Sequence, residues 1–158
     1  SKAMIDALNA VSVDEMHVTE CVLLPDDAKN SMSVVSASDY VITFEEKCST
    51  EEKSKLLGSV MDFMVQKEIV ILKKTKKSER EENIKPGIMK CELRGDSMYM
   101  LLSTGSEYNL KPELVMQALY SFSGIEHNQF HYHIHRLETY MDSPKGGIMP
   151  LYQAGTSF

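Results

Sequence analysis

Residues 69–77 read Ile-Val-Ile-Leu-Lys-Lys-Thr-Lys-Lys, so an apolar run of four residues passes directly into four lysines within five positions. A succession of β-branched and aliphatic residues favours a strand. Residues 78–86, Ser-Glu-Arg-Glu-Glu-Asn-Ile-Lys-Pro, follow with mixed charge. The stretch predicts a strand over residues 69–75 whose end carries concentrated positive charge.

The segment before this stretch predicts a strand and then a helix. Residues 39–45 alternate between apolar and polar side chains, which is typical of a strand. Ser49 and Glu52 have the spacing of a capping box, which indicates the start of a helix. The apolar residues that follow recur at helical spacing, and fully burying each of them contributes about 1.5–3 kcal/mol. The expected buried stripe consists of Leu56, Leu57, Val60, Met61, Met64 and Val65.

The segment after the stretch predicts a hairpin, a helix and a last strand. Residues 88–93 and 97–102 flank an Arg-Gly-Asp turn, Pro112 suits the first turn of a helix, and residues 130–140 read as a strand. From residue 39 onward the order is strand, helix, two or three strands, helix, strand. This is the order of a ferredoxin-like split βαβ fold, an α+β fold with helices on one face of an antiparallel sheet.

The two ends of the chain are expected to lie outside this ferredoxin-like domain, which we place at residues 37–141. Residues 1–30 predict a helix and a strand, and the helix starts without a capping residue. We therefore expect the natural chain to continue upstream, and residues 1–30 to be the remnant of an N-terminal unit. Residues 142–158 predict an irregular tail.

Charge and composition limit the class of protein. The chain has 158 residues and a net charge of −6, so a basic patch is a local feature and wholesale coating of nucleic acid or anionic membrane is excluded. Three cysteines without paired spacing fit reduced thiols. No apolar run reaches about 18 residues, and the first residues lack the basic, apolar, small-residue order of a signal peptide, so we expect a cytoplasmic protein without a membrane partner.

The lysines of residues 73–77, joined by Lys85, Lys90 and Lys111, are candidates for contacting phosphates. Binding that neutralises several phosphates depends steeply on salt. The alternative is a solvated strand end, at which lysines oppose pairing with another sheet edge and nearby glutamates cancel part of the charge. The residues alone leave both interpretations open.

Three histidines, His131, His133 and His135, alternate with apolar residues and are expected to line one face of one strand. Alternate strand residues lie about 6.6–7 Å apart, so two of them can share a metal ion, and three rarely do without a further ligand. A solvated outer face explains the same alternation. We therefore predict no metal site and no cofactor.

No set of residues predicts a catalytic site. Cys21, Cys48 and Cys91 each lie in or beside an apolar strand or a helix start, where inert thiols are common. We predict no catalytic residue in this chain, which leaves open whether it contributes to an enzyme with other protein segments.

Several short motifs occur in a fixed order with fixed intervals. They are Leu-Leu-Pro-Asp-Asp-Ala at 23–28, Ala-Ser-Asp-Tyr at 37–40, Lys-Lys-Thr-Lys-Lys at 73–77, Ile-Lys-Pro at 84–86, Leu-Leu-Ser-Thr-Gly-Ser at 101–106, Asn-Leu-Lys-Pro-Glu-Leu at 109–114 and Ile-His-Arg-Leu-Glu at 134–138. As a set they resemble the C-terminal part of the radical-SAM-linked family, bacterial proteins of uncharacterised function, over nearly the whole chain.

The resemblance implies a partner and a set of site residues. Members of that family are encoded beside, or fused behind, a radical SAM protein with a cobalamin-binding type of domain, so the partner would carry the iron–sulfur cluster. This chain has no Cys-x-x-x-Cys-x-x-Cys, and it lacks the Ser-His-Leu-Asp and Gly-Phe-Asn-Pro-His-Pro stretches of the family's N-terminal region. The shared motifs contain the candidate nucleic-acid-binding residues, namely Lys73, Lys74, Thr75, Lys76, Lys77, Lys85, Asn109, Lys111 and Arg136.

Three hypotheses follow from these observations. The first is an accessory domain that binds RNA, either tRNA or ribosomal RNA, through this basic strand edge and presents it to the radical SAM protein. The second is a protein-interaction domain that docks directly on that partner. The third is half of an enzyme whose site lies in the missing N-terminal region.

Overall fold

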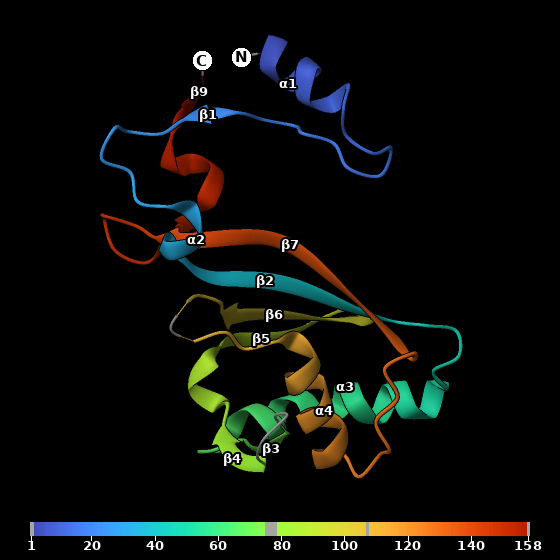
Figure 1. Ribbon diagram of the computed structural model, residues 1–158. Coiled ribbons are helices and arrows are strands. Elements are labelled where there is room, and N and C mark those ends of the chain that lie inside the picture. The colour runs from blue at the N-terminus through green and yellow to red at the C-terminus, as the bar shows by residue number, and fades with distance from the viewer. Residues whose placement is uncertain (1, 75–78, 107, 158) are drawn as a thin grey trace.

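A five-stranded antiparallel sheet of order β5-β6-β2-β7-β8 forms the centre of the computed structural model (Figure 1). The structure describes residues 2–74, 79–106 and 108–157. The strands of this sheet are β2 (Val35–Phe44), β5 (Ile88–Arg94), β6 (Ser97–Ser103), β7 (Tyr132–Asp142) and β8 (Ile148–Pro150). Together with its helices the sheet makes a mixed α+β structure, as the sequence predicts.

Strand β2 is the central strand and fixes the register of its neighbours. It pairs with β6 from Ala37 opposite Ser103 to Ile42 opposite Met98, and with β7 along its length. The register on β7 shifts between Asp39 and Tyr40, which indicates a β-bulge.

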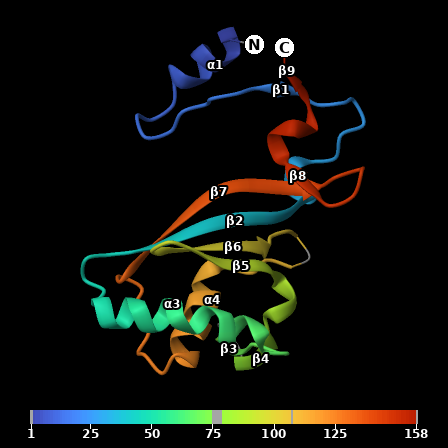
Figure 2. The same cartoon turned by 180° about the vertical axis from the view of Figure 1, so that it is seen from behind.

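Two helices cover one face of the sheet, α3 (Thr50–Val65) and α4 (Pro112–Phe122) (Figures 1 and 2). The apolar core lies between these helices and the sheet. Its fully buried members include Ile42, Leu56, Val60, Phe63, Met98, Met100, Leu102, Val115, Met116, Leu119 and Tyr120.

Helix α3 begins where the sequence predicts, but its buried face is narrower. Ser49 caps the helix, because its Oγ accepts a hydrogen bond of 3.1 Å from the Glu52 N–H. Met61 and Val65, two residues of the expected stripe, are 70% and 76% exposed. The buried line instead runs through Leu56, Val60 and Phe63 at i, i+4 and i+7, so positions 61 and 65 lie beyond its edge.

The strand predicted over residues 69–75 is β3 (Val70–Lys74), and it pairs with β4 (Glu79–Asn83) in a separate two-stranded sheet. Ile71 is buried whereas Val70 and Leu72 are exposed, so this short sheet has one inner face. The one-turn helix η1 (Lys85–Gly87) then leads into β5. Strand β4 was not predicted, because its sequence Glu-Arg-Glu-Glu-Asn has no apolar alternation.

The face of the central sheet away from the helices carries a buried carboxylate, Asp39. Its Oδ2 accepts hydrogen bonds of 3.0 Å from the hydroxyls of Tyr99 and Tyr140, and its Oδ1 accepts one of 2.8 Å from the Glu138 N–H. The Arg94 guanidinium lies 3.6 Å from the centre of the Tyr99 ring. Stacking of this kind covers the ring of Tyr99 on the open face.

The two ends of the chain meet on the side of the sheet away from α3 and α4 (Figures 1 and 2). Strand β1 (Val22–Leu23) pairs with β9 (Thr156–Ser157). The remaining elements here are α1 (Lys2–Asn9), α2 (Ser31–Val34) and η2 (Leu151–Ala154). None of the described helices combines the length and the apolar character that crossing a membrane requires.

Candidate functional site

The predicted nucleic-acid-binding residues fall on several elements, of which the β3–β4 hairpin carries the lysine run. Thr75, Lys76 and Lys77 lie outside the described residues, and Lys74 is described only by its backbone position in β3, opposite Glu79. The structure describes the side chains of the remaining members of the set.

Lys73 is paired with an acidic neighbour on the opposing strand. Its Nζ lies 3.0 Å from Glu82 Oε2, and the same oxygen is 3.2 Å from Arg80. The hydrogen bond from Lys73 is the main reason that the pKa of Glu82 lies below its ordinary value. The positive charge of Lys73 is therefore held in place by a carboxylate and is partly balanced by it.

Lys85 and the loop after β6 lie beside this hairpin. The Lys85 ammonium donates to the carbonyl oxygen of Met64 in the last turn of α3, where a cation favours the helix dipole. The pKa of Tyr108 is raised, mainly because the side chain is partly buried and secondly because the charge of Glu82 is near. Glu82 thus links the hairpin to the loop that contains Asn109.

The other members of the set are more widely placed. Asn109 forms an isolated β-bridge with Thr104, and Lys111 is the capping residue at the start of α4. Arg136 is exposed on β7 opposite Tyr40, and β7 pairs with β2 and β8 rather than with the hairpin.

A groove of about 460 Å³ runs beside β3, between this strand and the two helices. Residues of β3, Phe63 of α3 and Phe122 of α4 are among those that line it. Phe122 is 43% exposed and packs edge-on against Phe63, with 5.7 Å between the ring centres. Strand β3, which carries Lys73, therefore lies near an exposed aromatic ring.

The three histidines do not line one strand face, so that expectation was wrong. Strand β7 begins at Tyr132, and His131 precedes it in a turn where the Phe130 N–H donates to Asn128 Oδ1. This turn sets the direction of His131 independently of the alternation in the strand. His133 and His135 do lie in β7, and His133 contacts Glu45.

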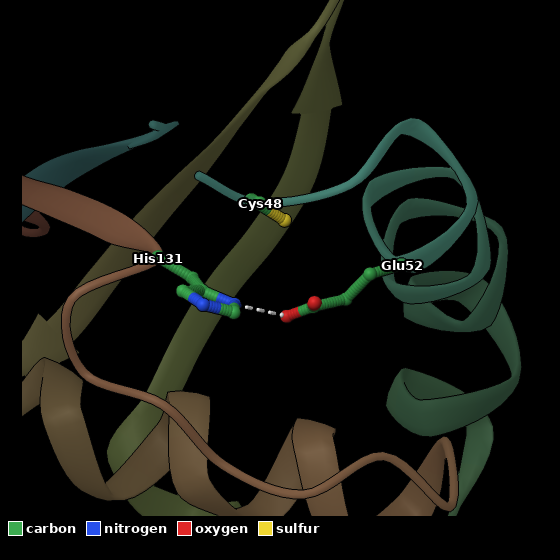
Figure 3. A group of neighbouring side chains, drawn as sticks. All are labelled: Cys48, Glu52 and His131. Carbon is green, nitrogen blue, oxygen red and sulfur yellow. Dashed lines mark hydrogen bonds and ion pairs between the residues drawn. The ribbon is translucent and has the colours of Figure 1, made fainter. Parts of the chain in front are cut away.

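His131 instead meets two residues from the start of α3 (Figure 3). The side-chain atoms Cys48 Sγ, Glu52 Oε1 or Oε2 and a ring nitrogen of His131 all lie within 4.8 Å of one another. His131 Nδ1 is 2.9 Å from Glu52 Oε1. We refer to these three residues as the Cys–Glu–His cluster.

Glu52 is held in this cluster by a buried tyrosine. The Tyr120 hydroxyl donates a hydrogen bond of 3.0 Å to the same Oε1 that contacts His131. In a capping box the glutamate returns to the N–H of the capping residue, here Ser49. Glu52 directs its Oε1 to Tyr120 and His131 instead, while its N–H keeps the bond to Ser49.

The hydrogen bonds around Asn128 define the protonation of His131. Because Asn128 Oδ1 accepts from the Phe130 N–H, its Nδ2 is the atom that faces His131 Nε2 at 2.9 Å. An amide nitrogen only donates, so His131 Nε2 is the acceptor and Nδ1 carries the proton. The neutral imidazole then donates from Nδ1 to Glu52.

Cys48 has an inert thiol in this environment. Cys48 is 7% exposed. Its pKa is raised to about 11, mainly by burial and secondly by the charge of Glu52. A thiol that stays protonated at neutral pH is a poor nucleophile. The chemistry that the cluster offers is therefore that of a ligand set with thiol, carboxylate and imidazole groups.

Sequence reasoning missed this cluster. Cys48 and Glu52 are one helical turn apart, but His131 is 79 positions after Glu52. Glu52 was recognised only as part of a helix cap, and His131 only as part of an alternating row. The contact between them depends on the packing of α3 against the connection between α4 and β7.

Comparison with known proteins identifies one family. A family model described as "Uncharacterized protein conserved in bacteria (DUF2344)" matches residues 1–112, which is more than half of the chain. No curated protein and no solved structure matches the chain.

Proposed function

The chain belongs to the DUF2344 family of bacterial proteins, and we propose that it is a non-catalytic accessory domain that binds RNA and works beside a radical SAM protein in the cytoplasm. The RNA would be tRNA or ribosomal RNA. The partner is suggested by the ordered motifs that resemble the radical-SAM-linked family, and one of these motifs contains all four lysines of residues 73–77.

The strand order supports a ferredoxin-like split βαβ plan for residues 37–141. Strands β7, β2, β6 and β5 are neighbours in that order, α3 lies between β2 and β5 in the chain, and α4 lies between β6 and β7. We propose this plan together with the division into residues 1–30, 37–141 and 142–158, the last of which adds β8 to the edge of the sheet. Sheets of this kind often bind RNA on the face away from the helices.

The observation that carries the proposal is the position of the lysine-bearing hairpin beside an open groove. Lys73 and Lys85 lie at this hairpin, and the groove next to it contains the exposed ring of Phe122. Lysines contact phosphates, and an exposed ring is a place for an unpaired base to stack. On the sheet face, by contrast, Arg94 already covers Tyr99, which favours binding at the hairpin.

The acidic residues of β4 set the expected strength of binding. A phosphate must compete with Glu82 for Lys73. The two side chains are only 31% and 15% exposed, so breaking the pair costs at least the roughly 0.2–1 kcal/mol of an exposed pair and lowers affinity. We therefore expect moderate binding with a strong dependence on salt and little preference for sequence.

Charge reversal on the hairpin tests the proposal. We expect the variant with Lys73, Lys74, Lys76 and Lys77 all changed to glutamate to lose binding to total cellular RNA in a filter-binding assay. A matched control changes the same number of lysines elsewhere, namely Lys2, Lys29, Lys47 and Lys145, so both variants have the same net charge. Equal loss of binding in both variants would show that overall charge, rather than the hairpin, determines binding.

A second candidate function is docking on the radical SAM protein itself. The alternating charges of the hairpin, with Lys73 between Glu82 and Arg80 across the strands, favour a protein surface of mixed charge as well. Lys74→Glu with Lys76→Glu should then abolish capture of the radical SAM protein while circular dichroism stays unchanged. Retained capture together with abolished RNA binding would favour the RNA proposal over docking.

A further inference from the structure

We propose that Cys48, Glu52 and His131 form a Zn²⁺ site with three protein ligands and one position open to exchange. The three side chains converge from the β2–α3 connection, the first turn of α3 and the segment before β7 (Figure 3). This site is separate from the lysine-bearing hairpin, and it goes beyond the RNA-binding proposal.

The chemistry of the three groups favours zinc. A thiolate, a carboxylate and an imidazole are its usual protein ligands, with Zn–S near about 2.3 Å and Zn–N and Zn–O near about 2.0–2.2 Å. Magnesium and calcium prefer oxygen ligands, which makes a sulfur and a nitrogen poor partners for them. Three protein ligands leave the fourth position of a tetrahedron for water or another small ligand.

The geometry requires only small movements. Tetrahedral zinc bonds of these lengths place ligand atoms roughly 3.3–3.8 Å apart. His131 Nδ1 and Glu52 Oε1 now lie 2.9 Å apart with a proton between them, and all three ligand atoms are within 4.8 Å. The ion would take the place of that proton, and the two atoms would separate by a few tenths of an ångström.

The hydrogen bonds of the cluster determine how many protons are released when the ion binds. The Cys48 thiol loses its proton to solvent when sulfur binds the ion. His131 stays neutral, because its proton moves from Nδ1, which binds the ion, to Nε2. One proton is therefore released for each ion bound, and it comes from Cys48.

Two neighbouring side chains suit the positions of supporting groups. Tyr120 is fully buried and donates to the Glu52 carboxylate, so it restrains the oxygen ligand. Asn128 contacts His131 Nε2, and rotation of its amide would present Oδ1 to the new Nε2–H in exchange for the hydrogen bond from the Phe130 N–H. A ligating histidine usually donates its second N–H to an oxygen in this way.

The surroundings shield the site without closing it. Cys48 is 7% exposed, and the side chains of Glu52 and His131 are 16% and 23% exposed. An ion here would be held against the core but remain within reach of water. A simple structural hydrogen bond between His131 and Glu52 would not need a thiol as the third group of the cluster.

Titration with Co²⁺, a spectroscopic substitute for Zn²⁺, tests the site in the whole chain. We expect one Co²⁺ per chain, with thiolate-to-cobalt charge transfer and the intense visible bands of four-coordinate Co²⁺, both removed by excess Zn²⁺. Cys48→Ser and His131→Gln should abolish the charge-transfer band. The matched controls Cys21→Ser and His133→Gln should keep it, and loss in these controls or retention in Cys48→Ser would overturn the proposal.

X-ray absorption of the unmodified chain loaded with Zn²⁺ gives a test that does not depend on the folding of any variant. We expect one sulfur at about 2.3 Å and nitrogen or oxygen neighbours at about 2.0–2.2 Å. A first shell without sulfur, or no bound Zn²⁺ after gel filtration, would overturn the proposal. The variant with glutamates at the hairpin should bind Zn²⁺ as the unmodified chain does, so failure of RNA binding and failure of the metal site are distinguishable.

Discussion

At the scale of single residues, Asp39 connects strands of the central sheet through hydrogen bonds to its side chain. Its carboxylate accepts from Tyr99, Tyr140 and the Glu138 N–H, and these bonds join β6, β2 and β7. Asp39 and Tyr99 are 5% and 8% exposed, whereas Tyr140 and Glu138 are half-buried. Removing the acceptor leaves the buried Tyr99 hydroxyl and two half-buried donors without a partner, each at a cost in free energy.

We predict that Asp39→Ala lowers the free energy of unfolding by about 3–5 kcal/mol, as for a broken buried polar network. Urea unfolding followed by circular dichroism measures this change. Asp142→Ala, at an exposed position of β7, is the matched control and should change it by less than about 0.5 kcal/mol. Similar values for the two variants would show that the network adds little to stability.

Cys91 gives a prediction that depends on pH. Burial raises the pKa of the Cys91 thiol to about 12 from its ordinary value of 9.0. A raised pKa contributes stability below about pH 9, and this contribution is lost as the pH rises toward about 12. Alkylation of Cys91 at pH 8, followed by mass spectrometry, should be slower in the folded chain than in urea by about a thousandfold or more. Equal rates would contradict the raised pKa of this partly buried thiol.

At the scale of elements, the register of α3 separates residues that the sequence pattern groups together. Phe63 is 1% exposed and contacts Phe122, whereas Met61 is 70% exposed. We predict that Phe63→Ala lowers the unfolding free energy by about 3–5 kcal/mol and that Met61→Ala changes it by less than about 0.5 kcal/mol. Thermal and urea unfolding measure both, and a large effect of Met61→Ala would mean that the helix is rotated.

The start of α3 shows what local sequence can predict. Ser49 and Glu52 predict a helix start because the capping bond joins residues three positions apart. Neither the exposure of Met61 nor the second partner of Glu52 follows from that spacing, since both depend on where the helix meets the sheet and α4. The helix was therefore predictable and its buried face only in part.

The β3–β4 hairpin shows what local sequence cannot predict. The apolar run of β3 predicts a strand, but its partner β4 has no apolar alternation and is recognised only from the pairing of Leu72 with Glu81 and Lys73 with Arg80. The same holds for the Cys–Glu–His cluster, since long-range packing alone brings His131 to Glu52. Sites made from distant segments leave no local pattern in a single sequence.

At the scale of the whole molecule, the structure has two distinct sides. The helices, the hairpin and its groove lie on one side of the central sheet, and the paired ends β1 and β9 lie on the other (Figures 1 and 2). In the proposed function, RNA binds on the helix side at the hairpin. The radical SAM protein would then have the side with the paired ends available for contact.

The most direct test of the proposed function is the salt dependence of RNA binding by the unmodified chain. We predict that the logarithm of the binding constant falls linearly with the logarithm of salt concentration, with a slope of roughly −0.7 per phosphate neutralised on single-stranded RNA. Replacing a single lysine, as in Lys73→Glu, should make the slope shallower by about 0.7 if that lysine binds a phosphate in the unmodified chain. Affinity that is absent at low salt, or that does not change with salt, would contradict RNA binding at the hairpin.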